Sequence, residues 1–207
     1  MIPLDPAKLH AYFAALPGSD RIATSFALRG LVDWLERRQP ERVCDIGVGI
    51  GTTTALIARW SAAAIVAVED DPWCHAQAVL NLRHLRWIAH DIIWYDKIPH
   101  YMTFQFVVLD GHQVRLEDWA CLESRAVVFV EGGRRGQRAA LEAWLRAEHR
   151  PFCHAEWKPP RTRSKGYAVY VMTPTRWERL WFAGVRWREG WRDLRARLSG
   201  AVIGKNR

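Results

Sequence analysis

The segment that decides the fold is Asp45-Ile46-Gly47-Val48-Gly49-Ile50-Gly51-Thr52, at the end of the short apolar run 42–46. Glycines directly after a strand permit a tight turn and let a ligand approach the backbone at the start of the next helix. A dinucleotide fingerprint, G-x-G-x-x-G, would have glycine where Thr52 stands. Asp45 also places a carboxylate at the turn, which repels a pyrophosphate and attracts an ammonium group. The segment therefore predicts a site for a ligand that carries an amine.

Strand-like and helix-like segments alternate along most of the chain, which predicts βαβ units and a mostly parallel sheet. No helix separates the last two strands, so we expect them to pair as an antiparallel hairpin at one edge. The expected strands are 42–46, 64–68, 85–89, 104–109, 125–130, 152–157 and 167–172. The expected helices are an opening helix that begins at Asp5-Pro6 and stops at Pro17-Gly18, followed by 20–38, 53–61, 72–84 and 135–148.

Acidic side chains follow five successive predicted strands. Asp45 ends the first, Glu69 the second, Asp110 the fourth and Glu131 the fifth, while the predicted third strand is followed by His90-Asp91. The carboxyl ends of parallel strands meet at one edge of the sheet, where such folds bind ligands. These acids predict a single cleft that suits a ligand with an amine, a ribose and a positive centre, and that repels a polyphosphate.

The pattern Asp45-x-Gly47-x-Gly49-x-Gly51 resembles the acidic first motif of the class I S-adenosylmethionine-dependent methyltransferases, and the resemblance covers about residues 20–172. It implies a single-domain α/β fold of the Rossmann-like type. The sheet would have seven strands, mostly parallel with an antiparallel final strand, and helices on both faces. The implied cofactor is S-adenosylmethionine, with ribose bound by Glu69 and the adenine amine near Asp91. The cofactor-binding residues that it implies are Asp45, Gly47, Gly49, Gly51, Glu69, Asp91 and Asp110.

The stretch 107–133 is most similar to bacterial small-molecule O-methyltransferases, including sugar, antibiotic and catechol-type enzymes. Their Asp-Gly-x-His is one residue shorter here, as Asp110-Gly111-His112, and Glu131-Gly132 replaces their usual Asp followed by Asn. In metal-dependent members, acids at both places hold a divalent cation. Asp110 and Glu131 are therefore the candidate ligands of such a cation, through hard carboxylate oxygens, although a third ligand is missing.

The acceptor atom is inferred by elimination. The Asn/Asp-Pro-Pro-aromatic tetrapeptide of amine and base methyltransferases does not follow the fourth strand, and no Pro-Cys nucleophile is present. An oxygen nucleophile of a small hydroxylated metabolite remains, methylated by in-line displacement at the sulfonium. We expect Asp110 and His112 to be catalytic, with His112 the best-placed general base and His90 and His100 poorer candidates.

The basic charge of the chain is concentrated in its last third. The protein carries 30 Lys+Arg against 22 Asp+Glu, and residues 146–207 alone hold 15 against 5. We expect Gly184 and Gly190 to divide the C-terminal segment into two short helices. Its tryptophans would pack on the core or on a second subunit; an anionic partner, RNA or a membrane is the competing interpretation. The apolar residues at helical spacing are Trp177, Leu180, Trp181, Trp187, Trp191, Leu194 and Leu198.

The chain is predicted to form one domain, in which N-terminal helices (1–40) cover the site. They precede a cofactor-binding core (41–172) and a basic, Trp-rich C-terminal segment (173–207). The four cysteines form no metal-binding or redox pattern, so buried thiols are expected. The longest apolar run, Ala62–Val68, is too short to cross a bilayer. We expect a cytoplasmic enzyme with a small-molecule acceptor and a possible homodimer. Two alternatives stay open: an RNA methyltransferase that docks through the basic segment, and a catalytically idle binding module.

Overall fold

A computed structural model describes residues 5–83, 85, 92–110, 116–159 and 166–203, with side chains of the last helix up to Glu189. Its helices are α1 (Pro6–Ala14), α2 (Ser25–Arg38), α3 (Thr52–Trp60), α4 (Pro72–Arg83), α5 (Arg135–Ala147) and α6 (Arg176–Ile203), with short 3₁₀ turns η1 (Ser19–Arg21) and η2 (Leu116–Cys121). Its strands are β1 (Arg42–Ile46), β2 (Ala64–Val68), β3 (Ile92–Tyr95), β4 (Phe104–Leu109), β5 (Leu122–Glu131), β6 (Phe152–Trp157) and β7 (Tyr167–Met172).

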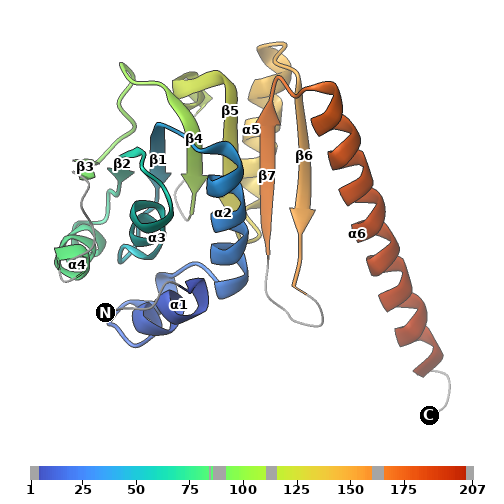
Figure 1. Cartoon of the computed structure of the whole chain (residues 1–207), viewed down its shortest axis with the longest axis horizontal. Coiled ribbons are helices and arrows are strands. Elements are labelled where there is room, and N and C mark those ends of the chain that lie inside the picture. Colours follow the sequence, from blue (N-terminus) through green and yellow to red (C-terminus); the bar gives the residue numbers. More distant parts are fainter. Residues whose placement is uncertain (1–4, 84, 86–91, 111–115, 160–165, 204–207) are drawn as a thin grey trace.

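The described strands form one seven-stranded sheet in the order β3-β2-β1-β4-β5-β7-β6 (Figure 1). The first five strands of this order run parallel, and β7 is antiparallel to both β5 and β6. This confirms the expected Rossmann-like sheet and its antiparallel edge hairpin. Ile46 is in register with Val68 on one side and with Leu109 on the other, so the segments after β1, β2 and β4 emerge side by side. Helix α1 lies beyond this edge of the sheet (Figure 1).

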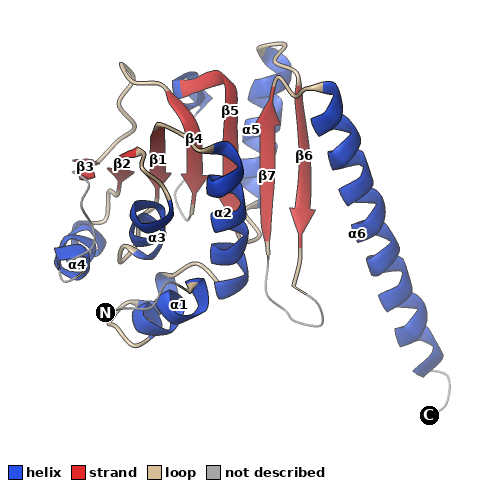
Figure 2. Cartoon of the chain, in the orientation of Figure 1, coloured by secondary structure: helices blue, strands red, loops and turns tan. Residues whose placement is uncertain are grey.

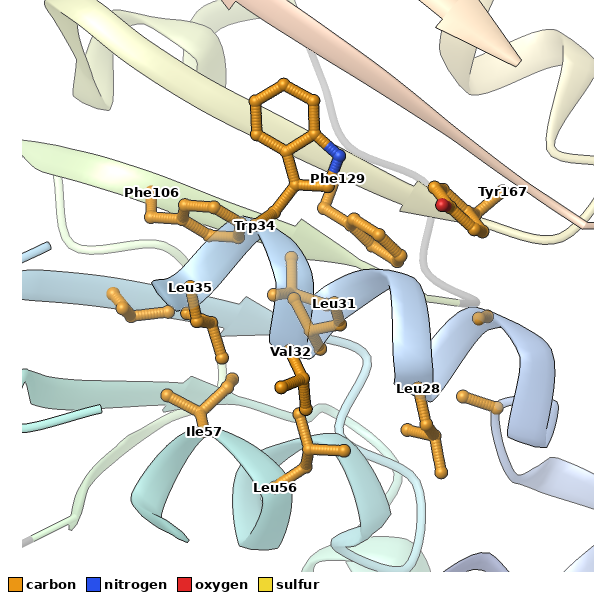
Figure 3. Close-up of a cluster of buried hydrophobic side chains, with 14 of the residues drawn as sticks. Leu28, Leu31, Val32, Trp34, Leu35, Leu56, Ile57, Phe106, Phe129 and Tyr167 are labelled. Carbon is orange, nitrogen blue, oxygen red and sulfur yellow. The ribbon is translucent and has the colours of Figure 1, made fainter. Parts of the chain in front are cut away.

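Helices cover both faces of the sheet, as expected (Figure 2). Helices α2 and α3 share one apolar cluster with Phe106 and Phe129 of the sheet, and buried Leu31, Leu35 and Leu56 fill the space between them (Figure 3). Helix α5 and η2 pack on the other face through a second cluster of buried side chains. That cluster is centred on Trp119, Leu141, Leu145, Val107, Val128 and Tyr170.

The N-terminal helices begin where side chains can cap them. The Asp5 carboxylate accepts a hydrogen bond from the Ala7 N–H, and Pro6 occupies the first turn, as the sequence predicted. Helix α2 begins at Ser25 and not near residue 20, because the Thr24 hydroxyl accepts from the Ala27 N–H and ends the extended segment there. Residues 19–21 form only a 3₁₀ turn.

The third strand lies later in the chain than predicted. It is Ile92–Tyr95, and it pairs in parallel with β2 from Ile65↔Ile92 to Val68↔Tyr95. This segment is β-branched and aromatic, as strands favour. Of the strand predicted at 85–89, residues 86–89 lie outside the described residues. Asp91 consequently precedes this strand, and the acid that follows it is Asp96.

The C-terminal segment is one continuous helix, contrary to the two short helices that Gly184 and Gly190 suggested. Glycine weakens a helix interior by only about 0.5–1 kcal/mol, which tertiary packing easily offsets. Phe182 is fully buried and Trp181 packs on Trp34, as expected of this segment. Trp177 and Trp187 are instead 79% and 66% exposed and do not pack on the core. Among the described residues, no helix is both long and apolar enough to cross a membrane.

Candidate cofactor site

The glycine turn between β1 and α3 adopts a backbone that needs its glycines. Gly47, Gly49 and Gly51 all have positive φ, at 78°, 59° and 100°. The turn is fixed against α4, because the Asn81 side-chain amide donates to the Ile50 carbonyl at 2.9 Å. A Cβ at Gly51 would also lie 3.3 Å from Leu82. The turn is therefore held in a fixed, largely buried shape at the start of α3.

Asp45 places a completely buried carboxylate beneath this turn. Its Oδ2 accepts hydrogen bonds from the hydroxyls of Thr53 and Thr54, at 2.8 and 2.6 Å. Its Oδ1 is buried and has no hydrogen-bond partner among the described residues. Burial raises the pKa of Asp45 to about 7, against the opposing hydrogen bonds of the two threonines. A buried carboxylate with one unsatisfied oxygen is suited to receive a cationic donor such as an ammonium group.

Glu69 follows β2 and lies beside the same turn. Its Oε2 accepts from the Gly49 N–H at 2.7 Å, and its Oε1 accepts from the Asp71 N–H at 3.0 Å. Asp71 in turn caps α4, since its carboxylate accepts from the N–H groups of Trp73 and Cys74. The carboxylate of Glu69 is thus held next to the glycine turn by two backbone donors and keeps further lone pairs for ribose hydroxyls.

Asp110 and Glu131 meet at the carboxyl ends of β4 and β5. Both are buried, and an Nη atom of Arg134 lies 2.8 Å from Asp110 Oδ1. Glu131 also accepts from the Thr24 N–H at 3.3 Å, which ties the start of α2 to this edge of the sheet. The cluster of Asp110, Glu131 and Arg134, which we call the acid–arginine cluster, contains two carboxyls and one guanidinium.

Burial dominates the protonation of this cluster. It raises the pKa of Asp110, although the hydrogen bond and charge of Arg134 oppose the rise. Burial, followed by the nearby Asp110 charge, raises the pKa of Glu131 to about 7. The two acids therefore hold a proton more readily than exposed carboxyls do.

The cluster does not fit a divalent cation. The guanidinium of Arg134 donates a hydrogen bond to the Asp110 oxygen that a metal would need as a ligand. Because two positive charges repel at that distance, the guanidinium opposes binding of a cation there. Within the described ranges, no group of three or more His, Cys, Asp or Glu side chains is arranged to hold a metal. The candidate metal ligands predicted from the sequence are brought together, but an arginine lies beside them where a metal would bind.

Some of the predicted site residues cannot be placed. Asp91, His90 and His112 lie outside the described residues, so their assignment to adenine binding or catalysis stays a prediction. His100 is exposed, in the connection between β3 and β4.

The sequence reasoning missed three parts of the site: the threonine pair beneath the turn, Arg134 and Thr24. Thr53 and Thr54 directly follow the glycine turn, so their closeness to Asp45 along the chain was a signal that could have identified them. Arg134 follows Glu131 by three residues, but its contact with Asp110 spans 24 residues and gives no local signal. Thr24 lies 107 residues from Glu131 and is equally invisible in the sequence.

Comparisons with known proteins fit this geometry. No protein-family model matches the sequence, and a search of curated proteins found no match either. Solved structures do match, among them the O-methyltransferase TomG of Streptomyces achromogenes in complex with S-adenosylmethionine. It is 16% identical, with a TM-score of 0.57, over 82% of this chain and 88% of that one. The fold is that of the class I methyltransferases.

Two further matches share this methyltransferase fold. An O-methyltransferase from Bacillus cereus in complex with S-adenosylhomocysteine has a TM-score of 0.62 and 14% identity, over 84% of this chain and 93% of that one. A precorrin-8w decarboxylase from Methanobacterium thermoautotrophicum has a TM-score of 0.57 and 16% identity, over 77% of this chain and all of that one. At these identities the likeness establishes the fold and leaves the reaction to be argued from the site.

Proposed function

We propose that this protein is an S-adenosylmethionine-dependent methyltransferase that methylates an oxygen of a small hydroxylated metabolite. The observation that carries the proposal is the unsatisfied Oδ1 of Asp45, buried beneath a turn of three positive-φ glycines. An ammonium group satisfies that oxygen, whereas a dinucleotide phosphate would be repelled by it. The solved structures of the same fold that hold S-adenosylmethionine or S-adenosylhomocysteine support the assignment.

Different residues of the site would bind different parts of this cofactor. Asp45 would receive its ammonium group, and the backbone of Gly47, Gly49 and Gly51 would follow its amino-acid part. Glu69 would accept hydrogen bonds from the ribose hydroxyls. When bound, the cofactor supplies a methyl group on a positively charged sulfur.

The acid–arginine cluster would orient the acceptor. The acceptor hydroxyl would lose its proton to a base as its oxygen takes up the methyl group that the bound cofactor would supply. Asp110, at the end of β4, is the described residue that we assign as this base, and His112 remains a candidate beside it. Orientation and exclusion of water would supply most of the rate enhancement. Arg134 would provide the fixed positive charge at this edge, so no metal is required.

Isothermal titration with S-adenosylhomocysteine, with NAD as the comparison, tests the proposal. We expect the first to bind and NAD not to bind. At a concentration 100 times the Kd, the ligand should stabilise the protein by about 2.7 kcal/mol. Replacing Asp45 with Ala or Glu69 with Gln should abolish binding, because each substitution removes a charged acceptor.

The matched control is Asp70→Asn, which removes the exposed acid next to Glu69 and should leave the affinity unchanged. Failure of the wild-type protein to bind at millimolar concentration would rule the proposal out. Binding that survives both Asp45→Ala and Glu69→Gln would place the cofactor elsewhere in the fold.

A further inference from the structure

The outer face of α6 exposes large apolar side chains. Trp177, Leu180 and Trp187 are 79%, 55% and 66% exposed. A Cβ built on Gly184 would meet no atom within 4 Å, so the space at this position is open. These four positions are separated by three, four and three residues, which puts them on one side of the helix. The sequence repeats this spacing further along α6 at Trp191, Leu194 and Leu198.

The opposite side of α6 docks on the protein. Phe182 is fully buried, with its ring 5.9 Å from that of Trp34 in α2 and 6.4 Å from that of Trp157 in β6. Val185 packs against the same core. With 3.6 residues per turn, Phe182 points about half a turn away from the stripe of Trp177, Leu180 and Trp187. The helix lies along the β6 edge and runs on past the sheet (Figure 1), so the stripe faces away from the body of the protein.

The charges around this stripe are positive. Arg176, Arg179, Arg186 and Arg188 are all exposed. The described part of α6 also holds two acids, Glu178 and Glu189. Glu178 is turned toward the protein, where it pairs with Arg38 at 2.6 Å and accepts from the Thr175 N–H. Glu189 lies on the same side of the helix, and its charge acts on Tyr167 of the sheet. The outer face of α6 is therefore an apolar stripe with an arginine rim.

We propose that the outer face of α6 binds an anionic lipid surface, with its tryptophans at the level of the headgroups and its arginines on the lipid phosphates. Tryptophan and leucine on one side of a helix with arginine flanking them is the composition of helices that lie in the interface of a bilayer. The proposal concerns docking of the enzyme and goes beyond the chemistry of its cofactor site.

Other occupants fit this surface less well. A second copy of α6 would bring two arginine rims together, and like charges at close range oppose such pairing. Single-stranded nucleic acid is bound in a positively charged groove where bases stack on aromatic rings, whereas the outer face of a single helix is convex and gives the strand no groove to follow. An anionic bilayer satisfies both parts of the surface, since apolar side chains enter the headgroup region while the rim meets negative charge.

Co-sedimentation with vesicles tests the proposal on the full-length protein. We expect binding to vesicles of phosphatidylcholine that contain phosphatidylserine, little binding to phosphatidylcholine alone, and weakening as salt is raised. The double variant Trp177→Ala/Trp187→Ala should lower the partition coefficient on the order of tenfold or more. Arg176→Gln/Arg188→Gln should weaken binding and flatten its salt dependence.

Trp73→Ala is the matched control, because Trp73 of α4 is 44% exposed but lies outside α6, and its vesicle binding should equal that of the wild type. Thermal unfolding should show that all variants are folded. Absence of binding to phosphatidylserine vesicles, or binding that the double variant retains, would overturn the proposal. A dimer in sedimentation analysis, or RNA binding, that disappears in the double variant would overturn it in favour of that partner.

Discussion

A single buried acid under a glycine turn has consequences for the whole protein. Asp45 is fully enclosed, receives hydrogen bonds on one oxygen, and has a pKa raised to about 7 by burial. An unfolded chain ionises an aspartate near pH 4. The folded, cofactor-free protein therefore binds a proton at Asp45 that the unfolded chain has already released, across about three pH units.

The Asp45→Asn substitution should change how stability depends on pH. A raised folded pKa contributes stability that is complete below about pH 4 and is lost as the pH rises through about 7. The wild-type protein without ligand should thus lose on the order of a few kcal/mol relative to Asp45→Asn between pH 4 and pH 8. Urea unfolding across this range measures it. A constant difference between the two proteins would show that Asp45 is not buried as an acid.

Arg134→Asn should create a metal site that the wild type lacks. The substitution removes the guanidinium from Asp110 and supplies an amide oxygen beside two carboxyls, which is a ligand set for a hard cation. We expect Mn²⁺ to raise the melting temperature of the variant and not that of the wild type. Arg135→Asn, which changes the exposed neighbour, should behave as the wild type does. Mn²⁺ binding to wild-type protein that Asp110→Asn removes would contradict this account.

Whether the role of a single residue can be predicted from the sequence depends on how far along the chain it lies from its partners. Asp45, Gly49 and Glu69 were recognisable because a strand, a turn and a following strand place them within 24 residues of one another. The pairing of Asp110 with Arg134 was not recognisable in the sequence, because it depends on how the start of α5 packs beside the end of β4. The role of such a pair is a property of the folded chain.

Local sequence signals determine where helices begin and end, except where tertiary packing outweighs them. Helix α6 starts with a capping box, in which the Thr175 hydroxyl accepts from the Glu178 N–H and the Glu178 carboxylate accepts from the Thr175 N–H. It then passes through Gly184 without a break, because Phe182 and Val185 anchor the turns on either side. The expected break in the helix does not occur, because the low helix propensity of glycine costs less free energy than burial of an aromatic ring contributes.

Glycine-to-alanine substitutions at two helical glycines, Gly184 and Gly30, should change stability in opposite directions. Gly184→Ala should stabilise the protein by about 0.5–1 kcal/mol, because the new methyl group meets open space. Gly30→Ala in α2 should destabilise it by about 1–3 kcal/mol, since a Cβ there would lie 2.6 Å from the Tyr167 hydroxyl oxygen and closer still to its ring. Urea unfolding of both variants checks the pair. Equal effects would mean that α6 does not hold its helical form at Gly184.

Across the whole molecule, an aromatic cluster joins segments that are far apart in the chain. Trp34 of α2 contacts Trp157 of β6 and both Trp181 and Phe182 of α6, at ring-centroid distances of 5.8–6.3 Å. Arg37 adds a guanidinium 4.7 Å above the Trp181 ring. This cluster attaches the basic C-terminal helix to the sheet, and so couples the surface of α6 to the rest of the fold.

Phe182→Ala should therefore be costly, and Trp177→Ala should not. Removing a fully buried aromatic ring leaves a cavity and costs about 3–5 kcal/mol. Trp177 is 79% exposed, so its loss should change stability by no more than about 0.5 kcal/mol. Chemical denaturation of the two variants makes the comparison. A small effect of Phe182→Ala would mean that α6 is not docked on Trp34.

The sequence alone determined the glycine turn, the carboxylates beside it, six of the seven strand positions and the antiparallel hairpin. Each of these depends on residues that are neighbours in the chain, where sterics and the alternation of apolar residues leave a local pattern. The tertiary structure decided that an arginine faces Asp110, that α6 is continuous, and that Trp177 and Trp187 point outward while Trp181 packs on Trp34. These depend on contacts between distant segments, whose energies outweigh local preferences and appear only when the chain is folded.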